Sequence, residues 1–142
     1  MKKEITTTIQ INASSEIIWK ILTDFEKYPE WNSFVKSVTG EVKAGNKIKV
    51  KIEPPEEKGM SFKPKIMTCE ANKELSWIGH FLLPGIFDGE HKFELTDNGN
   101  GTTTFKQSEK FKGILVGILN IENTKKGFEA MNKKLKELAE QY

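Results

Sequence analysis

The amino-acid sequence predicts an α+β fold in which a curved, seven-stranded antiparallel sheet wraps around a long C-terminal helix. Two observations lead to this prediction. Short segments rich in β-branched and aromatic residues are separated by turn sequences, and residues 121–142 then change to a helical period. A sheet of this kind needs one face covered, and the last segment is the longest element that can cover it.

The predicted strands are short and regularly spaced. Residues 5–11 alternate apolar and polar side chains with a period of two, which is typical of a half-buried strand. The breaks between later segments carry glycine, proline and asparagine, which favour turns. Such a series indicates an antiparallel meander with strands at 5–11, 34–42, 46–53, 61–71, 74–82, 87–97 and 102–111.

Two short helices are expected after the first strand. Ser14 or Ser15 can cap the free N–H groups of a helix, and apolar residues follow at helical spacing. We expect this pattern to end at Tyr28-Pro29, because the residue before a proline is disfavoured in the α region.

The C-terminal helix carries one apolar stripe, with charged residues at most of the remaining positions. Gly127 lies in its interior, where glycine costs about 1 kcal/mol relative to alanine, so a close contact or a bend is indicated there. The stripe consists of Ile121, Thr124, Phe128, Met131, Leu135, Leu138 and Tyr142.

Composition narrows the class of protein. A chain of 142 residues fits one domain spanning 1–142. The net charge is only +2 and the chain has no arginine, so we expect no nucleic-acid partner. No apolar run is long enough for a transmembrane segment or typical of a signal peptide, so we expect a cytoplasmic location.

The histidines, His80 and His91, and the single cysteine, Cys69, show no ligand spacing, and we expect neither a metal nor a cofactor.

Several sequence stretches resemble the SRPBCC (START-like, helix-grip) superfamily, and within it the bacterial proteins described as polyketide cyclase/dehydrase and lipid transport. The resemblance implies a helix-grip fold with a ligand-binding cavity between the sheet and the C-terminal helix. The superfamily contains carriers, cyclases, hydrolases and co-chaperones, so the resemblance does not choose among functions. The stretches are 18–25 (IWKILTDF), 28–32 (YPEWN), 62–65 (FKPK) running to 75–79 (LSWIG), 83–93 (LPGIFDGEHKF), 107–113 (QSEKFKG) and 127–132 (GFEAMN).

Strand alternation places three polar side chains on the inward, aromatic face of the sheet. His91 shares its face with Phe87 and Phe93, and Gln107 and Glu109 share theirs with Phe105 and Phe111. A hairpin through residues 97–101 sets His91 opposite Gln107 or Glu109, depending on the register. The pair can be a general acid and base, or it can be a buried polar pair that satisfies its own hydrogen bonds or orients a ligand.

Two turn segments are unusually apolar for exposed loops. Residues 81–87 and 114–121 can form one hydrophobic mouth of the cavity, or they can pack on each other or on a second subunit, which would give a homodimer.

The leading hypothesis is a binding or carrier protein for a small hydrophobic molecule such as a lipid, polyketide or aromatic compound. The alternatives are a cyclase/dehydrase-type enzyme that uses His91 and Glu109, with Gln107 as a positioning group, and a protein-interaction module that uses the apolar mouth. The expected ligand-binding residues are Trp31, Phe62, Trp77, Phe81, Phe87, His91, Phe93, Phe105, Gln107, Glu109, Phe111, Ile118, Phe128 and Met131.

Overall fold

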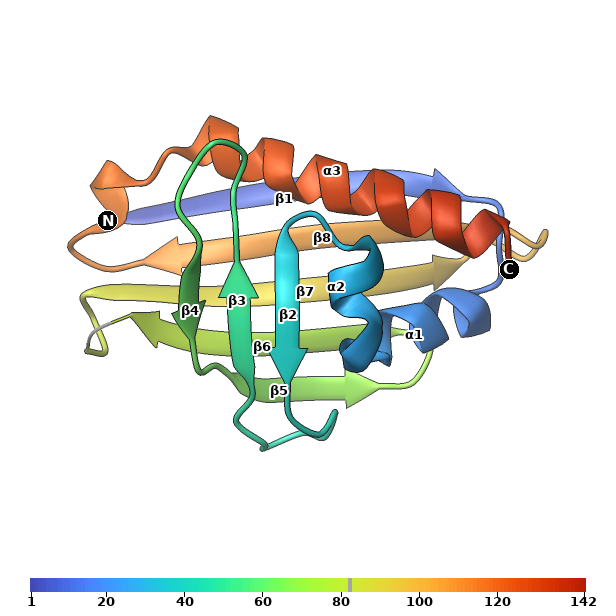
Figure 1. Cartoon of the computed structure of the whole chain (residues 1–142), viewed down its shortest axis with the longest axis horizontal. Helices are drawn as coiled ribbons and strands as arrows, with labels where there is room; N and C mark the ends of the chain where they lie inside the picture. Colours follow the sequence, from blue (N-terminus) through green and yellow to red (C-terminus); the bar gives the residue numbers. More distant parts are fainter. Residues whose placement is uncertain (82) are drawn as a thin grey trace.

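A computed structural model describes residues 1–81 and 83–142, except for the side chain of Phe81. Within those residues one strand is followed by three short helical segments, then by seven strands, a short 3-10 helix and one long helix (Figure 1). In chain order the elements are β1 (Lys2–Ile11), α1 (Ser15–Thr23), η1 (Phe25–Lys27), α2 (Tyr28–Trp31), β2 (Val35–Thr39), β3 (Lys49–Ile52), β4 (Met60–Phe62), β5 (Lys65–Glu70), β6 (Glu74–Phe81), β7 (Phe87–Asp97), β8 (Thr103–Lys112), η2 (Val116–Ile118) and α3 (Ile121–Glu140).

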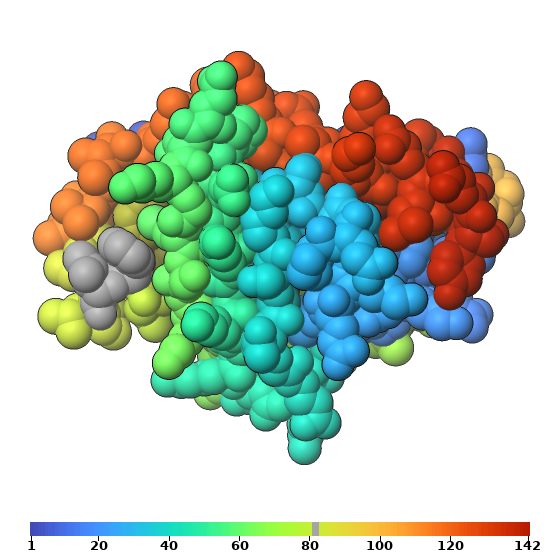
Figure 2. Space-filling view, viewed as in Figure 1, coloured from blue at the N-terminus to red at the C-terminus, as the bar shows by residue number. Residues whose placement is uncertain are grey.

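The strands form two sheets, so the prediction of one seven-stranded sheet is wrong. The larger sheet has five antiparallel strands in the order β1-β8-β7-β6-β5, and the smaller has three in the order β2-β3-β4. Figure 1 shows the smaller sheet crossing in front of the larger one at a steep angle, with α3 along the β1 side. In the space-filling view, the smaller sheet, α2 and α3 cover much of the larger sheet (Figure 2).

Pro64 divides the segment 61–71 that was predicted as one strand. Residues before it pair with β3, and residues after it pair with β6. Proline has no N–H to give to a strand ladder, which favours a break at this position. Its carbonyl accepts a hydrogen bond from the Ile48 backbone N–H at 2.9 Å, and an isolated bridge joins Lys47 to Lys65. The chain therefore passes from one sheet to the other at this corner.

The segment between β1 and β2 packs around a buried tyrosine. Ser14 caps α1 by accepting a hydrogen bond from the Ile17 N–H, as predicted. The helix ends at Thr23, before the expected stop. Tyr28 is itself α-helical although Pro29 follows it, because Pro29 occupies the first turn of α2, where no N–H is needed. The Tyr28 side chain is buried and its hydroxyl donates to the Leu22 carbonyl, and this burial raises the pKa of Tyr28 above its ordinary value.

The long helix α3 has the predicted apolar face, with Phe128, Met131 and Leu135 buried. Asn120 caps its first turn by accepting from the Asn123 N–H at 3.1 Å. Tyr142 was expected on the apolar stripe, but the helix ends at Glu140 and this tyrosine is 65% exposed.

Of the two alternatives expected at Gly127, a close contact or a bend, the structure has a close contact. A Cβ atom built on Gly127 would lie 2.5 Å from Cδ1 of Phe34, whose ring packs edge-on against Phe128 at 5.3 Å. Glycine at this position lets Phe34, directly before β2, approach the backbone of α3. The contact holds the smaller sheet against the helix.

We expect Gly127→Ala to lower the free energy of unfolding, although alanine is the better helix former. The added methyl group would displace the buried Phe34 ring, and overpacking of this kind costs about 1–3 kcal/mol, against a gain in helix propensity of about 1 kcal/mol. Denaturant unfolding measures the difference. In a Phe34→Ala background the same substitution should stabilise the protein. Stabilisation in the wild-type background would contradict the proposed contact.

Candidate functional site

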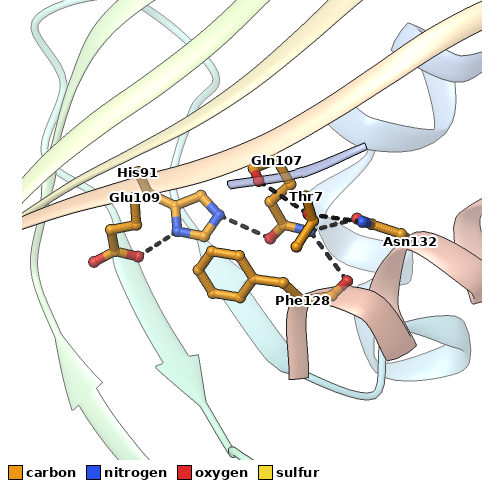
Figure 3. A network of polar contacts seen from close by, with 6 residues as sticks. All are labelled: Thr7, His91, Gln107, Glu109, Phe128 and Asn132. Atoms are coloured by element: carbon orange, nitrogen blue, oxygen red, sulfur yellow. Dashed lines mark hydrogen bonds and ion pairs between the residues drawn. The ribbon is translucent and has the colours of Figure 1, made fainter. Parts of the chain in front are cut away.

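The hairpin of β7 and β8 brings the predicted polar residues together. His91 lies directly opposite Glu109, which settles the register that the sequence left open. The Nδ1 atom of His91 lies 2.6 Å from Oε1 of Glu109, and its Nε2 atom lies 2.9 Å from Oε1 of Gln107 (Figure 3). His91 is only 4% exposed, so both ring nitrogens bond to protein groups rather than to bulk solvent.

The network continues from Gln107 into the core between β1, β8 and α3. The Gln107 side-chain amide donates to Oδ1 of Asn132 at 2.7 Å and to the Phe128 carbonyl at 3.4 Å. Asn132 donates to the Thr7 hydroxyl at 2.9 Å, and that hydroxyl donates to the Gln107 backbone carbonyl at 2.9 Å. The sequence analysis missed Thr7 and Asn132 as members of this site. The sequence contained one indication of this, because Thr7 shares a face of the first strand with Ile5 and Ile9.

Donor and acceptor roles in the network fix one proton of His91. The Phe128 carbonyl can only accept, so the Gln107 NH₂ group points toward it and the Gln107 oxygen points toward His91. Nε2 of His91 therefore carries a proton. One further proton lies between Nδ1 of His91 and Oε1 of Glu109. Without it, the lone pair of an unprotonated nitrogen would face the lone pair of a carboxylate oxygen at 2.6 Å, and the two atoms would repel each other.

Aromatic rings enclose the imidazole. The ring of His91 stacks on Trp77 with centroids 5.4 Å apart and an angle of 21° between the planes. Phe93 and Phe128 approach it at 4.7 and 5.0 Å. These contacts hold the ring in one orientation in apolar surroundings.

A cavity of about 310 Å³ lies beside this pair, between the two sheets and the start of α3. Volumes of this size are at the lower end of those found for small-molecule sites. Its lining comprises Phe34, Val35, Ile52, Pro54, Glu57, Lys58, Met60, Phe62, Trp77, Gly79, His80, Phe87, Gly89, His91, Glu109, Phe111, Leu115, Ile118, Leu119, Asn120 and Thr124.

The cavity contains only part of the predicted ligand-binding set. The predicted residues that line it are Phe62, Trp77, Phe87, His91, Glu109, Phe111 and Ile118. The predicted residues that do not line it are Trp31, Phe93, Phe105, Gln107, Phe128 and Met131. The side chain of Phe81, also predicted, lies outside the described residues, as does Leu82 of the expected mouth.

The difference has a simple packing cause. Phe93, Phe105, Phe128 and Met131 are fully buried and fill the space between the larger sheet and α3. The empty volume lies beyond them, toward the start of β7, and the smaller sheet forms its other wall. Trp31 lines a separate open groove of about 410 Å³ between α2 and the end of α3, and its indole N–H has no partner among the described residues.

Two glycines that the sequence analysis left out of the site face each other across β6 and β7. Gly79 pairs with Gly89, and both line the cavity. A Cβ atom on Gly89 would lie 2.4 Å from Oε2 of Glu109, so the absence of a side chain makes room for that carboxylate. A Cβ atom on Gly79 would lie 3.1 Å from the Phe62 ring. Their place on an inward strand face was the available signal.

The two apolar turn segments meet beside the cavity. The backbone N–H groups of Ile114 and Leu115 donate to the carbonyls of Gly85 and Ile86 at 3.2 and 3.0 Å. Leu83, Ile114 and Ile118 remain 68%, 73% and 82% exposed. Neighbouring segments therefore bond to each other through the backbone while their apolar side chains face outward.

A carboxylate on the outer face of β7 holds the first of these segments. Asp88 accepts hydrogen bonds from the Gly85 N–H at 3.0 Å and from Nδ1 of His80 at 2.6 Å. The hydrogen bond with His80 is the main cause that lowers the pKa of Asp88 below its ordinary value. The carboxylate is thereby kept in the form that binds the turn.

The described part of the chain has neither a metal-binding cluster nor a membrane-spanning helix. Across residues 1–81 and 83–142, no three His, Cys, Asp or Glu side chains are grouped closely enough to hold a metal ion. Over the same residues, no helix combines the length and apolar content needed to cross a membrane.

We expect Thr7→Val to lower the free energy of unfolding by about 1–3 kcal/mol, because it leaves the Asn132 side-chain amide without its acceptor in the core. Valine has nearly the same shape, so packing is preserved. Thr8→Val is the matched control, since Thr8 is exposed on the opposite face of β1. Equal effects of the two substitutions in denaturant unfolding would contradict the role of the network.

Comparison with known proteins agrees with this architecture. Residues 2–140 match the sequence profile of a family described as polyketide cyclase / dehydrase and lipid transport. A search of curated proteins found no match.

Solved structures with the same fold come from bacteria and plants. A START superfamily protein from Mycobacterium smegmatis has 21% identity and a TM-score of 0.72 over 97% of each chain. The major latex-like protein 151 of Panax ginseng has 8% identity and a TM-score of 0.79 over 97% of each chain. Norcoclaurine synthase from Thalictrum flavum, solved in complex with dopamine and hydroxybenzaldehyde, has 16% identity and a TM-score of 0.76 over 100% of this chain and 88% of that chain.

At these identities the structural likeness shows the fold alone. The profile match is of another kind, because it covers nearly the whole chain and agrees with the resemblance noted in the sequence. The protein therefore belongs to the polyketide cyclase/dehydrase and lipid transport family.

Proposed function

We propose that the protein binds or carries a small hydrophobic molecule, such as a lipid, polyketide or other aromatic compound, in the cavity between its two sheets. The observation that carries this proposal is the cavity of about 310 Å³ with a largely apolar wall. Each 100 Å² of apolar ligand surface removed from water contributes about 2.5 kcal/mol before the costs of association.

The wall offers a ligand flat aromatic surfaces on more than one side. Trp77, Phe87 and Phe111 come from the larger sheet and Phe62 from the smaller one. Phe87 and Phe111 are already in edge contact at 5.8 Å, and Trp77 is backed by Phe93 at 5.4 Å. Such supported rings are suited to a planar or cyclic molecule.

The polar groups support binding more than catalysis. His91 uses both ring nitrogens within the protein, and Gln107 lies behind it, away from the cavity. Among the members of the network in Figure 3, His91 and Glu109 line the cavity, and Glu109 is the one with a free oxygen. A single polar contact orients a ligand but supplies few of the groups that a multi-step reaction needs.

A cyclase/dehydrase-type enzyme is the second candidate, and the short contact between His91 and Glu109 at the cavity wall favours it. In this case one of the pair would exchange a proton with the substrate. The solved synthase complex with dopamine and hydroxybenzaldehyde demonstrates that the fold can hold an enzyme, but at 16% identity it carries no reaction over to this chain.

We expect purified protein to retain or take up an apolar ligand, detected by native mass spectrometry and by quenching of tryptophan fluorescence through Trp77. Leu115→Trp places a larger side chain in the wall and should weaken uptake at least tenfold. Met67→Trp is the matched control, because Met67 is exposed on β5 and does not line the cavity. Failure of the wild-type protein to bind any apolar compound would overturn the proposal.

The enzyme alternative predicts a loss of turnover in variants of the His91–Glu109 pair. Turnover of a candidate cyclase or dehydrase substrate should fall by about 100-fold or more in His91→Ala and in Glu109→Gln, since positioned acid–base groups contribute on this scale. Circular dichroism confirms that each variant is folded. Unchanged turnover in both variants would remove the pair from any reaction.

A further inference from the structure

The free oxygen of Glu109 is a hydrogen-bond acceptor that the cavity presents to a ligand from its interior. Oε1 of Glu109 is bound by His91, and no described residue bonds to Oε2. The Glu109 side chain is 17% exposed, although it lies on an inward strand face. In Figure 3 the second oxygen points away from His91 and from the rest of the network.

Several other polar groups around the cavity have partners. The Lys58 ammonium and the Trp77 indole N–H, which belong to lining residues, have none among the described residues, but both are donors. The Thr124 hydroxyl donates to the Asn120 carbonyl at 3.0 Å, and Oδ1 of Asn120 accepts from the Asn123 N–H. Glu57 accepts from the Asn123 amide, and His80 is paired with Asp88. Oε2 of Glu109 is therefore an acceptor that is both interior and unpaired among the described residues.

The proton count of the pair determines what this oxygen can do. If the shared proton lies on His91, Glu109 is a carboxylate and Oε2 is an acceptor. If the proton lies on Glu109, it occupies Oε1, where it bonds to Nδ1, and Oε2 is a carbonyl acceptor. Oε2 accepts a hydrogen bond in both states and donates in neither.

Gly89 fixes the position of this acceptor. A Cβ atom there would come within 2.4 Å of Oε2, so the carboxylate can lie against the β7 backbone only because residue 89 lacks a side chain. Phe111 is the next neighbour, 3.7 Å from the same point. The acceptor is thus held beside the aromatic wall rather than in the middle of the cavity.

We propose that the cavity selects apolar ligands that carry a hydroxyl group, an alcohol or a phenol, and that this group donates its hydrogen bond to Oε2 of Glu109. The inference rests on the proposed binding function and specifies its ligand class. A ligand with only acceptor groups, such as a methyl ether, would leave Oε2 desolvated and unpaired, and a carboxylate would meet an acceptor with no proton to offer.

Four compounds with one ring system test the proposal on the full-length protein. These are 9-phenanthrol, 9-methoxyphenanthrene, phenanthrene and phenanthrene-9-carboxylate, measured by isothermal titration calorimetry and by quenching of tryptophan fluorescence. The phenol should bind at least tenfold more tightly than the ether or the hydrocarbon. Tighter binding of the carboxylate than of the phenol would assign recognition to Lys58, which also lines the cavity, and would overturn the inference.

Two variants and a control assign the preference to Glu109. Glu109→Leu should reduce the phenol-to-ether affinity ratio to about one. Gly89→Ala, which displaces Oε2 but keeps the carboxylate, should lower that ratio severalfold and covers the case in which Glu109→Leu fails to fold. Glu90→Leu is the control. It removes a carboxylate next to Gly89 on β7, outside the cavity lining, and should leave the phenol-to-ether ratio unchanged.

The outcomes separate this inference from the proposed function. A preference for the phenol that Glu109→Leu abolishes and Glu90→Leu retains supports it. Equal binding of phenol, ether and hydrocarbon to the wild-type protein overturns the inference and leaves the binding function standing. A lack of binding by all four compounds overturns the function, and the inference with it.

Discussion

The side-chain amide of Gln107 orients the buried polar network on which the site depends. Its oxygen accepts from His91, while its nitrogen donates to Asn132 and to the Phe128 carbonyl. These bonds connect β7, β8 and α3, and the bond from Thr7 to the Gln107 backbone adds β1. Because all of these groups are buried, losing one partner would leave another polar group unsatisfied. The same constraint that positions the imidazole therefore also docks the long helix onto the sheet.

The corner at Pro64 has the second large effect on the architecture. An unbroken strand over 61–71 would have stayed in one sheet, and the segment carrying Phe62 would have remained beside β6 throughout. The break instead gives β4 to the smaller sheet, which lies across the larger one and closes the cavity from the other side. The empty volume exists because two layers of strands meet at a steep angle and the side chains near the start of β7 do not fill the gap.

Much of this fold could be predicted from the sequence, because periodicity reports on local structure. The long helix and the inward face of β7 and β8 follow from residue spacing. Gly127 in the helix interior indicated a close contact or a bend without deciding between them. The division into two sheets did not follow, since it depends on what the chain pairs with after Pro64. The expected stop at Tyr28-Pro29 was wrong because Pro29 lies in the first turn of α2, where a helix tolerates proline. Tyr28 therefore remains helical, with its ring buried.

The candidate site was predictable only in part for a related reason. Alternation identified His91, Gln107 and Glu109 as inward, but it cannot distinguish a packed position from one that borders empty space. Phe93 and Phe111 lie on inward faces of adjacent strands, yet only Phe111 meets the cavity, because Phe128 and Met131 fill the other end. Thr7 and Asn132 meet across 125 residues of sequence, a separation at which no local pattern gives information.

The shared proton between His91 and Glu109 also determines the electrostatic character of this end of the cavity. Whichever atom holds that proton, the two side chains together carry no net charge. A lipid or phenol that reaches this end of the cavity thus meets a dipole and not an ion, and an ionised ligand would lose its hydration without gaining a counter-charge from this pair. This end of the cavity is a neutral pair with one free acceptor, whereas Glu57 and Lys58 place charged groups elsewhere in the lining.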